Sequence, residues 1–172
     1  MKKFIIPKGC HYSNFVPKLQ LLEGCNYMQQ GGNITFTDSC AYDIDEESCV
    51  NKLFGFSFGI FGVHKNSVRF GWTYNTELNA IFIWKYVYIN GKLTKEKVFS
   101  CNIGEKHAYD IDAWRYHVKE NKQYVFDIRF KIDGKKVAEA EIESNKWFAL
   151  TLGPYFGGHT RAPHRIEILS DK

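Results

Sequence analysis

The stretch 125–143 constrains the fold more than any other part of this chain. From 126 to 132, apolar residues occupy every second position and charged residues lie between them, which gives a strand one apolar and one charged face. Asp133-Gly134 follows, and glycine accepts the positive φ of a two-residue turn. The alternation then resumes over 137–143. The pattern predicts an antiparallel β-hairpin with one buried face.

A second hairpin is indicated by the stretch 80–102, where an aromatic and β-branched run meets Asn90-Gly91 and returns over 95–102. Upstream, aromatic and small residues alternate over 51–62, and 67–74 is expected to pair with that strand. Helix signals are scarce, and 113–120 is expected to form at most a turn or two of helix. Further strands are expected over 18–23, 33–37, 40–44, 107–112, 147–152 and 165–169.

About a dozen short strands separated by turns predict an all-β fold, a two-sheet antiparallel β-sandwich. The aromatic content of 16% fits, because aromatic side chains fill the half-buried surface of a sheet. A chain of 172 residues buries a large core without disulfides or metal. We therefore expect one domain over 1–172, in which residues 1–32 supply an N-terminal strand and an irregular lead-in.

Charge and cysteine patterns exclude several classes of protein. The net charge is +4, but lysines and carboxylates are interspersed, whereas a nucleic-acid-binding protein concentrates its basic residues on one face. No specific nucleic-acid partner is expected. The five cysteines and six histidines lack structural zinc spacing, so we expect no metal and no cofactor. The odd cysteine count favours reduced thiols, although Cys40 and Cys49 could meet across a turn.

The N-terminal apolar run ends at Pro7 after three residues, whereas a signal peptide needs roughly 7–15. No apolar stretch reaches the roughly 18 residues of a membrane span. These patterns predict a protein made in the cytoplasm without an export signal or a membrane partner.

The hairpin units Tyr-Ile-Asn-Gly-Lys at 88–92 and Phe-Lys-Ile-Asp-Gly-Lys at 130–135, with the run 149–158, resemble the concanavalin A-like lectin/glucanase superfamily. More loosely, 51–57, 64–72 and 153–164 resemble uncharacterised jelly-roll proteins of gut bacteria and their phages. The resemblance covers about residues 33–170. It implies a jelly-roll, concanavalin A-like fold, and either lectin-like glycan binding or a structural role in a phage virion. A fold alone does not establish function.

The catalytic motifs of that superfamily are not matched. Its retaining glucanases carry Glu-x-Asp-x-x-Glu, which supplies two closely spaced carboxylates. The nearest approach here is Asp43-Ile44-Asp45-Glu46-Glu47, whose spacing and order differ, so we interpret it as an acidic turn. Neither the Gln-x-His strand of alginate-lyase-like members nor a legume-lectin calcium loop is found. We predict no catalytic residue.

The first candidate binding segment is 64–74. On a strand, Arg69 faces away from Trp72 and Tyr74. A guanidinium suits bidentate binding of carboxylate or phosphate, and aromatic faces suit stacking on sugar rings. The alternative is an exposed arginine beside an ordinary core face.

The second candidate is the loop 153–164, where glycines flank Tyr155-Phe156 before two histidines and an arginine. His159 and His164 lie five apart across Pro163, so they are not a helical metal pair. Histidine as a residue type can act as an acid, a base or a ligand. The alternative is a polar loop whose glycines and proline shape a turn.

The leading hypothesis is a non-enzymatic, lectin-like β-sandwich module with a binding or assembly role, whose partner is a glycan or another protein and which could oligomerise. The alternative is a carbohydrate-active enzyme, either a polysaccharide lyase or a glycoside hydrolase, that uses a His/Arg/Tyr site. The sequence leaves open whether 64–74 and 155–165 form one site. The predicted ligand-binding residues are His64, Arg69, Trp72, Tyr74, Tyr155, His159, Arg161 and His164.

Overall fold

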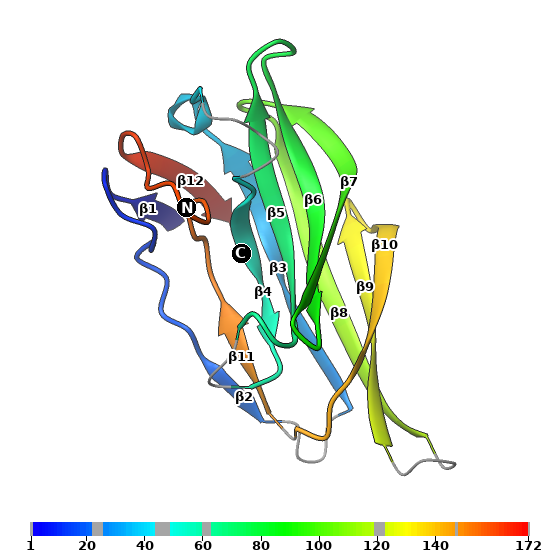
Figure 1. Cartoon of the computed structure of the whole chain (residues 1–172). Coiled ribbons are helices and arrows are strands. Elements are labelled where there is room, and N and C mark those ends of the chain that lie inside the picture. The colour runs from blue at the N-terminus through cyan, green and yellow to red at the C-terminus, as the bar shows by residue number, and fades with distance from the viewer. Residues whose placement is uncertain are drawn as a thin grey trace.

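The computed structural model describes residues 2–21, 26–43, 49–59, 63–118, 123–146 and 148–171. Within them, two six-stranded sheets form, and every pair of neighbouring strands is antiparallel (Figure 1). The first sheet has the order β1 (Lys2–Ile6), β12 (Ile166–Asp171), β3 (Tyr27–Phe36), β8 (Lys106–Val118), β9 (Gln123–Ile132) and β10 (Lys135–Glu143). The second has the order β2 (Leu19–Leu21), β11 (Phe148–Leu152), β4 (Asn51–Ser57), β5 (Ser67–Asn75), β6 (Ala80–Ile89) and β7 (Lys92–Asn102).

Both predicted hairpins are confirmed. In the hairpin of β9 and β10, Ile132 pairs with Lys135 across the turn. In the hairpin of β6 and β7, Ile89 pairs with Lys92 across Asn90-Gly91. Asp133 has φ 50° and Gly134 has φ 75°, the left-handed pair that a two-residue turn requires. Asn90 and Gly91 repeat this geometry with φ 49° and 85°.

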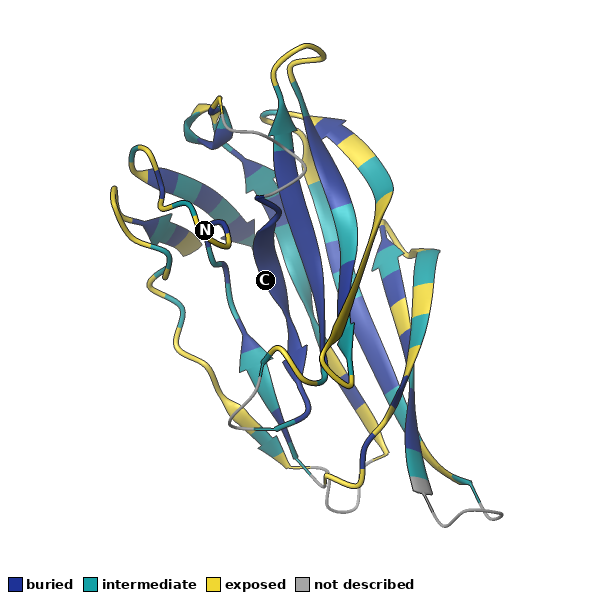
Figure 2. Cartoon of the chain, viewed as in Figure 1, coloured by how far each residue is buried: buried dark blue, intermediate teal, exposed yellow. Residues whose placement is uncertain are grey.

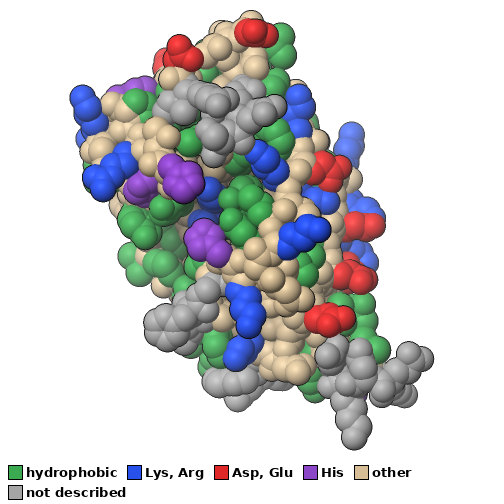
Figure 3. Space-filling view, in the orientation of Figure 1, with side chains coloured by type: hydrophobic (Ala, Val, Ile, Leu, Met, Phe, Trp, Pro, Cys, Tyr) green, Lys and Arg blue, Asp and Glu red, His purple; other side chains and the backbone are tan. Residues whose placement is uncertain are grey.

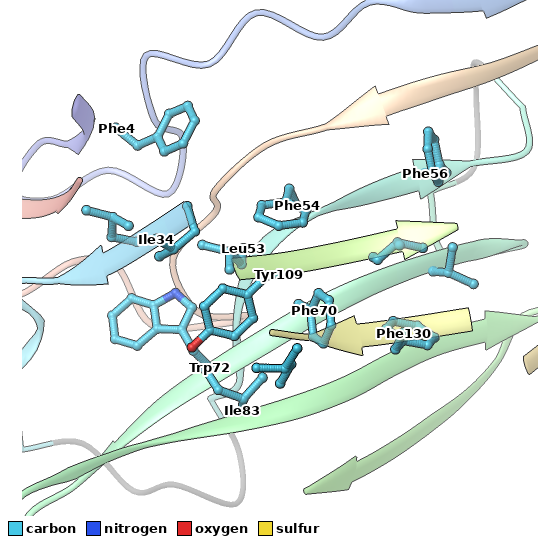
Figure 4. Close-up of a cluster of buried hydrophobic side chains, with 14 of the residues drawn as sticks. Phe4, Ile34, Leu53, Phe54, Phe56, Phe70, Trp72, Ile83, Tyr109 and Phe130 are labelled. Carbon is cyan, nitrogen blue, oxygen red and sulfur yellow. The ribbon is translucent and has the colours of Figure 1, made fainter. Parts of the chain in front are cut away.

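The two sheets pack face to face around an aromatic core, so the predicted two-sheet β-sandwich is confirmed (Figure 4). Phe70 of β5 meets Tyr109 of β8 and Phe130 of β9, with ring centroids 5.5 and 5.1 Å apart. Trp72 lies 5.3 Å from Phe36 of β3 and is fully buried. These contacts join the sheets directly and fix which side of each strand faces inward.

Two predicted elements are wrong. Residues 113–118 continue β8 instead of forming helix, because the strand pairs with β3 on one side and β9 on the other and buries Ala113. Residues 40–43 form no strand. Cys40 ends a 3-10 helix (Asp38–Cys40), and 41–43 follow it without regular secondary structure. Ser39 Oγ in that helix accepts a hydrogen bond from the Glu167 amide at 2.7 Å.

Strand β3 begins at Tyr27, inside the stretch expected to be an irregular lead-in. Parts of other expected strands lie outside the described residues, namely 22–23, 44, 60–62 and 147, as do 119–120 of the expected helical turn.

Strand β4 is buried along both faces (Figure 2). It is paired to β11 and β5, and its register with β5 shifts between Lys52 and Gly55, a β-bulge. At Gly55 the strands approach so closely that a Cβ atom would lie 1.9 Å from Val68 O. The bulge leaves Lys52 and Gly55 on the outer side of the second sheet, opposite Gly71 and Arg69 of β5.

Candidate ligand-binding cavity

A cavity of about 560 Å³ lies on the outer face of the second sheet. Its floor comes from β4, β5 and β6, and its walls come from residues 12–17 and 152–159. Four of the eight predicted site residues line it, namely His64, Arg69, Tyr155 and His159. The fold therefore brings the 64–74 and 155–165 segments together at this place. On this face, histidine side chains lie beside hydrophobic and basic ones (Figure 3).

The other four predicted residues lie outside the cavity lining. Trp72 belongs to the sandwich core, because residues alternate sides along β5 and Arg69 takes the outer side. Tyr74 donates a hydrogen bond to Asn79 Oδ1 near the end of β5. His164 Nε2 donates to Ser39 O at 2.8 Å, and Arg161 is exposed.

The loop after β11 builds one wall and also enters the core. Tyr155 exchanges two backbone hydrogen bonds with Lys52, at 2.8 and 3.0 Å, so the loop extends the sheet beside β4. Neighbouring side chains in such a segment point to opposite sides. Tyr155 accordingly faces the cavity, whereas Phe156 is fully buried 5.1 Å from Tyr42. The loop is thus part of the sandwich and more than a polar turn.

Gly157 is required by the path of this loop. It has φ 63°, and a Cβ atom at its position would lie 2.2 Å from Thr160 O. Its amide donates to Asn51 Oδ1 at 2.6 Å and its carbonyl accepts from Lys52 Nζ at 2.9 Å. Side chains of β4 therefore fix the loop through the backbone of Gly157.

Two buried cations form the floor. Lys52 is 7% exposed and Arg69 is 8% exposed. Arg69 Nη2 donates a hydrogen bond to Gly153 O at 2.7 Å. Lys52 Nζ donates one to Gly157 O at 2.9 Å. The alternative interpretation of Arg69 as an exposed arginine is therefore wrong, because the loop and residues 12–17 lie over it.

Burial governs the ionisation of this floor. Desolvation, and then the charge of Arg69, lower the pKa of Lys52 to about 8. Desolvation lowers the pKa of Arg69 to about 10, so its guanidinium stays charged at neutral pH. It raises the pKa of Tyr86, and also that of Tyr155, above the usual phenol range. At neutral pH the cavity therefore holds protonated phenols beside mostly charged cations.

Aromatic rings line the cavity around these cations. The Tyr155 ring stacks on His11 with centroids 5.2 Å apart and meets Tyr12 edge-on at 5.1 Å. On the other side, Tyr88 lies edge-on to His64 at 5.1 Å. Tyr86 lies under Lys52 Nζ, which is 4.7 Å from its ring centroid. The cavity thus combines aromatic faces with positive charge.

Sequence reasoning missed Lys52, Lys95, Tyr12, Tyr86 and Tyr88 as lining residues. The sequence does contain a signal for Lys52. The run 49–58 is apolar except for Asn51, Lys52 and Ser57, and Lys52 is its one charged residue. The sequence does not show which face of the sheet Lys52 occupies, because the β-bulge that follows breaks the period-2 pattern.

The described residues contain no group of three His, Cys, Asp or Glu side chains that could hold a metal ion. Most of the acidic cluster 43–47 lies outside the described part of the chain.

Cys40 and Cys49 are thiols and do not form a disulfide with each other. Cys10 and Cys101 are thiols as well. Cys25 is not among the described residues. No helix within the described ranges is long and apolar enough to cross a membrane.

Comparisons with known proteins add little to this picture. No family model matches the chain. No curated protein matches it either. Among solved structures, the chain is similar to the carbohydrate-binding module CBM66 from Bacillus subtilis, with 10% identity over 90% of this chain and 78% of that one and a TM-score of 0.34. A similarity this low supports no inference about function, so any functional conclusion depends on the cavity itself.

Proposed function

We propose that this protein is a non-enzymatic, lectin-like β-sandwich module that binds a glycan in the cavity over β4, β5 and β6. One observation carries the proposal. Four predicted binding residues from two distant segments, His64 and Arg69 on one side and Tyr155 and His159 on the other, line one cavity together with Tyr12, Tyr86 and Tyr88.

The chemistry of the lining supports a sugar ligand. Ligand sites are concave and largely apolar, with a few polar groups that fix orientation. Here tyrosine rings offer flat apolar faces to a sugar ring, while phenol, imidazole and guanidinium groups can hydrogen-bond its hydroxyls. The volume of about 560 Å³ lies within the range of small-molecule sites.

The enzymatic alternative rests on histidines and tyrosines sharing this cavity. Two features favour binding over turnover. Glycoside hydrolysis generally uses a pair of carboxylates, and none of the described lining residues is Asp or Glu. A tyrosine acting as a general base needs a pKa near the working pH, whereas burial raises the pKa of Tyr86 and of Tyr155.

A glycan array probed with the wild type and with Tyr155→Ala tests this function. We expect binding to defined glycans that falls at least about tenfold in Tyr155→Ala, because the variant removes the ring that forms one wall. Trp72→Phe is the matched aromatic control, since Trp72 lies in the core. Reducing-end and unsaturated-product assays on the bound glycans are expected to show no turnover. Products that vanish in His159→Ala would establish the enzymatic alternative.

The assembly role is tested separately by the mass of the protein in solution. A defined oligomer would support an assembly role, and a strict monomer that binds glycans would leave glycan binding as the function.

A further inference from the structure

We propose that the cavity recognises an acidic sugar, a glycan whose ring carries a carboxylate or a sulfate, and that Lys52 and Arg69 bind this anionic group. The inference rests on the proposed function and names the ligand class for the same cavity.

The charged side chains among the described lining residues are all basic. Lys52, Arg69 and Lys95 line the cavity, with His64 and His159 beside them. The described lining residues include no carboxylate. Charged clefts with low-dielectric walls concentrate ligands of opposite sign. A neutral sugar would not require this arrangement.

The two floor cations have no charged partner among the described residues. Both donate to neutral backbone carbonyls, Gly153 O and Gly157 O, and neither takes part in an ion pair with a described carboxylate. Buried charges are normally paired, because taking an isolated ion out of water is strongly unfavourable. The floor of the cavity therefore carries positive charge that an anion would neutralise.

The protein does not use all the donor groups of these two cations. The Nε–H of Arg69 is buried and has no hydrogen-bond acceptor among the described residues, so the guanidinium charge is incompletely compensated. An ammonium has three donors, and the hydrogen bond to Gly157 O uses one of those on Lys52. A carboxylate or sulfate oxygen accepts several such bonds at once.

The first sheet offers a contrast within the same molecule. There Asp112 is 1% exposed, and Lys131 Nζ lies 2.5 Å from its carboxylate on the neighbouring strand. Tyr27 also donates a hydrogen bond to Asp112 at 2.8 Å. At that position the fold itself neutralises the buried charge. In the cavity the charge is left for a ligand.

The test compares acidic glycans with their neutralised forms. Polygalacturonate and its methyl ester form one pair, and chondroitin sulfate and carboxyl-reduced, desulfated chondroitin form the other. Binding is measured for the wild type, Lys52→Met, Arg69→Gln and Lys146→Met. Lys146 is exposed and does not line the cavity, so Lys146→Met is the control for the loss of one positive charge.

We expect at least one acidic glycan to bind, and to bind about tenfold or more weakly after neutralisation. The same loss is expected in Lys52→Met and in Arg69→Gln, with Lys146→Met within about twofold of wild type. Binding of polygalacturonate, whose only anionic group is a carboxylate, would identify the carboxylate as a sufficient anion, whereas chondroitin sulfate carries both groups and tests for an anion of either kind. Neutralised glycans that bind as well as acidic ones would overturn the inference, and so would acidic glycans that bind Lys52→Met as tightly as wild type.

A measurement without glycan separates this inference from the proposed function. Sodium sulfate is expected to raise the Tm of wild type and Lys146→Met above its value in sodium chloride of equal ionic strength, and to raise the Tm of Lys52→Met less. If this occurs while no glycan binds, the anion site stands and the glycan function fails. If Lys52→Met responds to sulfate as wild type does and no acidic glycan binds, the anion site itself is refuted.

Discussion

The pH dependence of stability should report the buried ammonium of Lys52. The perturbation is Lys52→Met, which keeps an unbranched side chain of similar length and removes the charge. The pKa of Lys52 is lowered from its ordinary value of 10.5 to about 8 in the folded protein. Above pH 8 the folded state therefore loses this proton before the unfolded state does, and the stability of the wild type should rise with pH over this window.

The magnitude follows from the two pKa values. The full difference corresponds to about 3 kcal/mol, at 1.36 kcal/mol per pKa unit. Its physical source is the loss of water around a side chain that is only 7% exposed and whose Nζ donates one hydrogen bond to the protein. Between about pH 7.5 and 9.5 the linkage relation gives roughly 2 kcal/mol of added stability to the wild type relative to Lys52→Met.

The assay is urea denaturation of both proteins at several pH values across this window, with the difference in unfolding free energy plotted against pH. Taking the difference removes contributions from other titrating groups that the two proteins share, among them Tyr86 and Tyr155 around Lys52. At pH 7, loss of the hydrogen bond to Gly157 O, about 1.5–3 kcal/mol for a charged donor, opposes relief of the desolvation penalty. The two proteins should then differ little in stability.

A difference that stays flat between pH 7.5 and 9.5, or that falls, would contradict a lowered pKa of Lys52. Either result would mean that the ammonium is solvated or paired in the folded state, and Lys52 would then add no uncompensated charge to the cavity floor.

Two further substitutions and one chemical modification test the geometry of the sandwich. Gly55→Ala should destabilise the protein by about 3 kcal/mol or more in denaturant titration, because its Cβ would lie 1.9 Å from Val68 O and overpacking shifts the backbone; a loss under about 1 kcal/mol would show that β4 and β5 lie farther apart. Iodoacetamide followed by peptide mass analysis should modify exposed Cys10 and spare Cys40 until the protein unfolds, because burial raises the pKa of Cys40 to about 12. Trp72→Phe should lower stability by about 1–3 kcal/mol by leaving a void, while glycan affinity stays within about twofold, since Trp72 lies outside the cavity lining.

The sequence predicted the sheet architecture where alternation and turn chemistry coincided. The turns Asp133-Gly134 and Asn90-Gly91 set the register of their hairpins, and the structure confirms both. The prediction failed where tertiary pairing decided the conformation. Residues 113–118 contain strand-favouring Trp114, Tyr116 and Val118, and β9 pairs with the whole segment while β3 pairs with Ala113 and Trp114.

The site was predictable in part for a similar reason. Arg69 was predicted as a charged residue in an alternating strand, and Tyr155 as an aromatic residue in a glycine-flanked loop. Their segments lie close together because of the long-range bridge between Tyr155 and Lys52, which the sequence does not show. Lys52 was missed because its face depends on the register shift before Gly55, which no local pattern reveals. Tyr86 and Tyr88 resembled ordinary strand aromatics.

The burial of β4 on both faces affects which parts of the proposed ligand site can change in sequence without unfolding the protein. A strand hydrogen-bonded on both sides and covered on both faces opens only when the whole molecule unfolds, whereas loops open locally and tolerate replacement. The cationic floor therefore belongs to the most durable part of the protein, and the rim, which includes Tyr12 and His159, belongs to segments that are not strands. Under the proposed function, substitutions at the rim would change which ligand binds, while the buried cations of the floor would keep the preference for an anion.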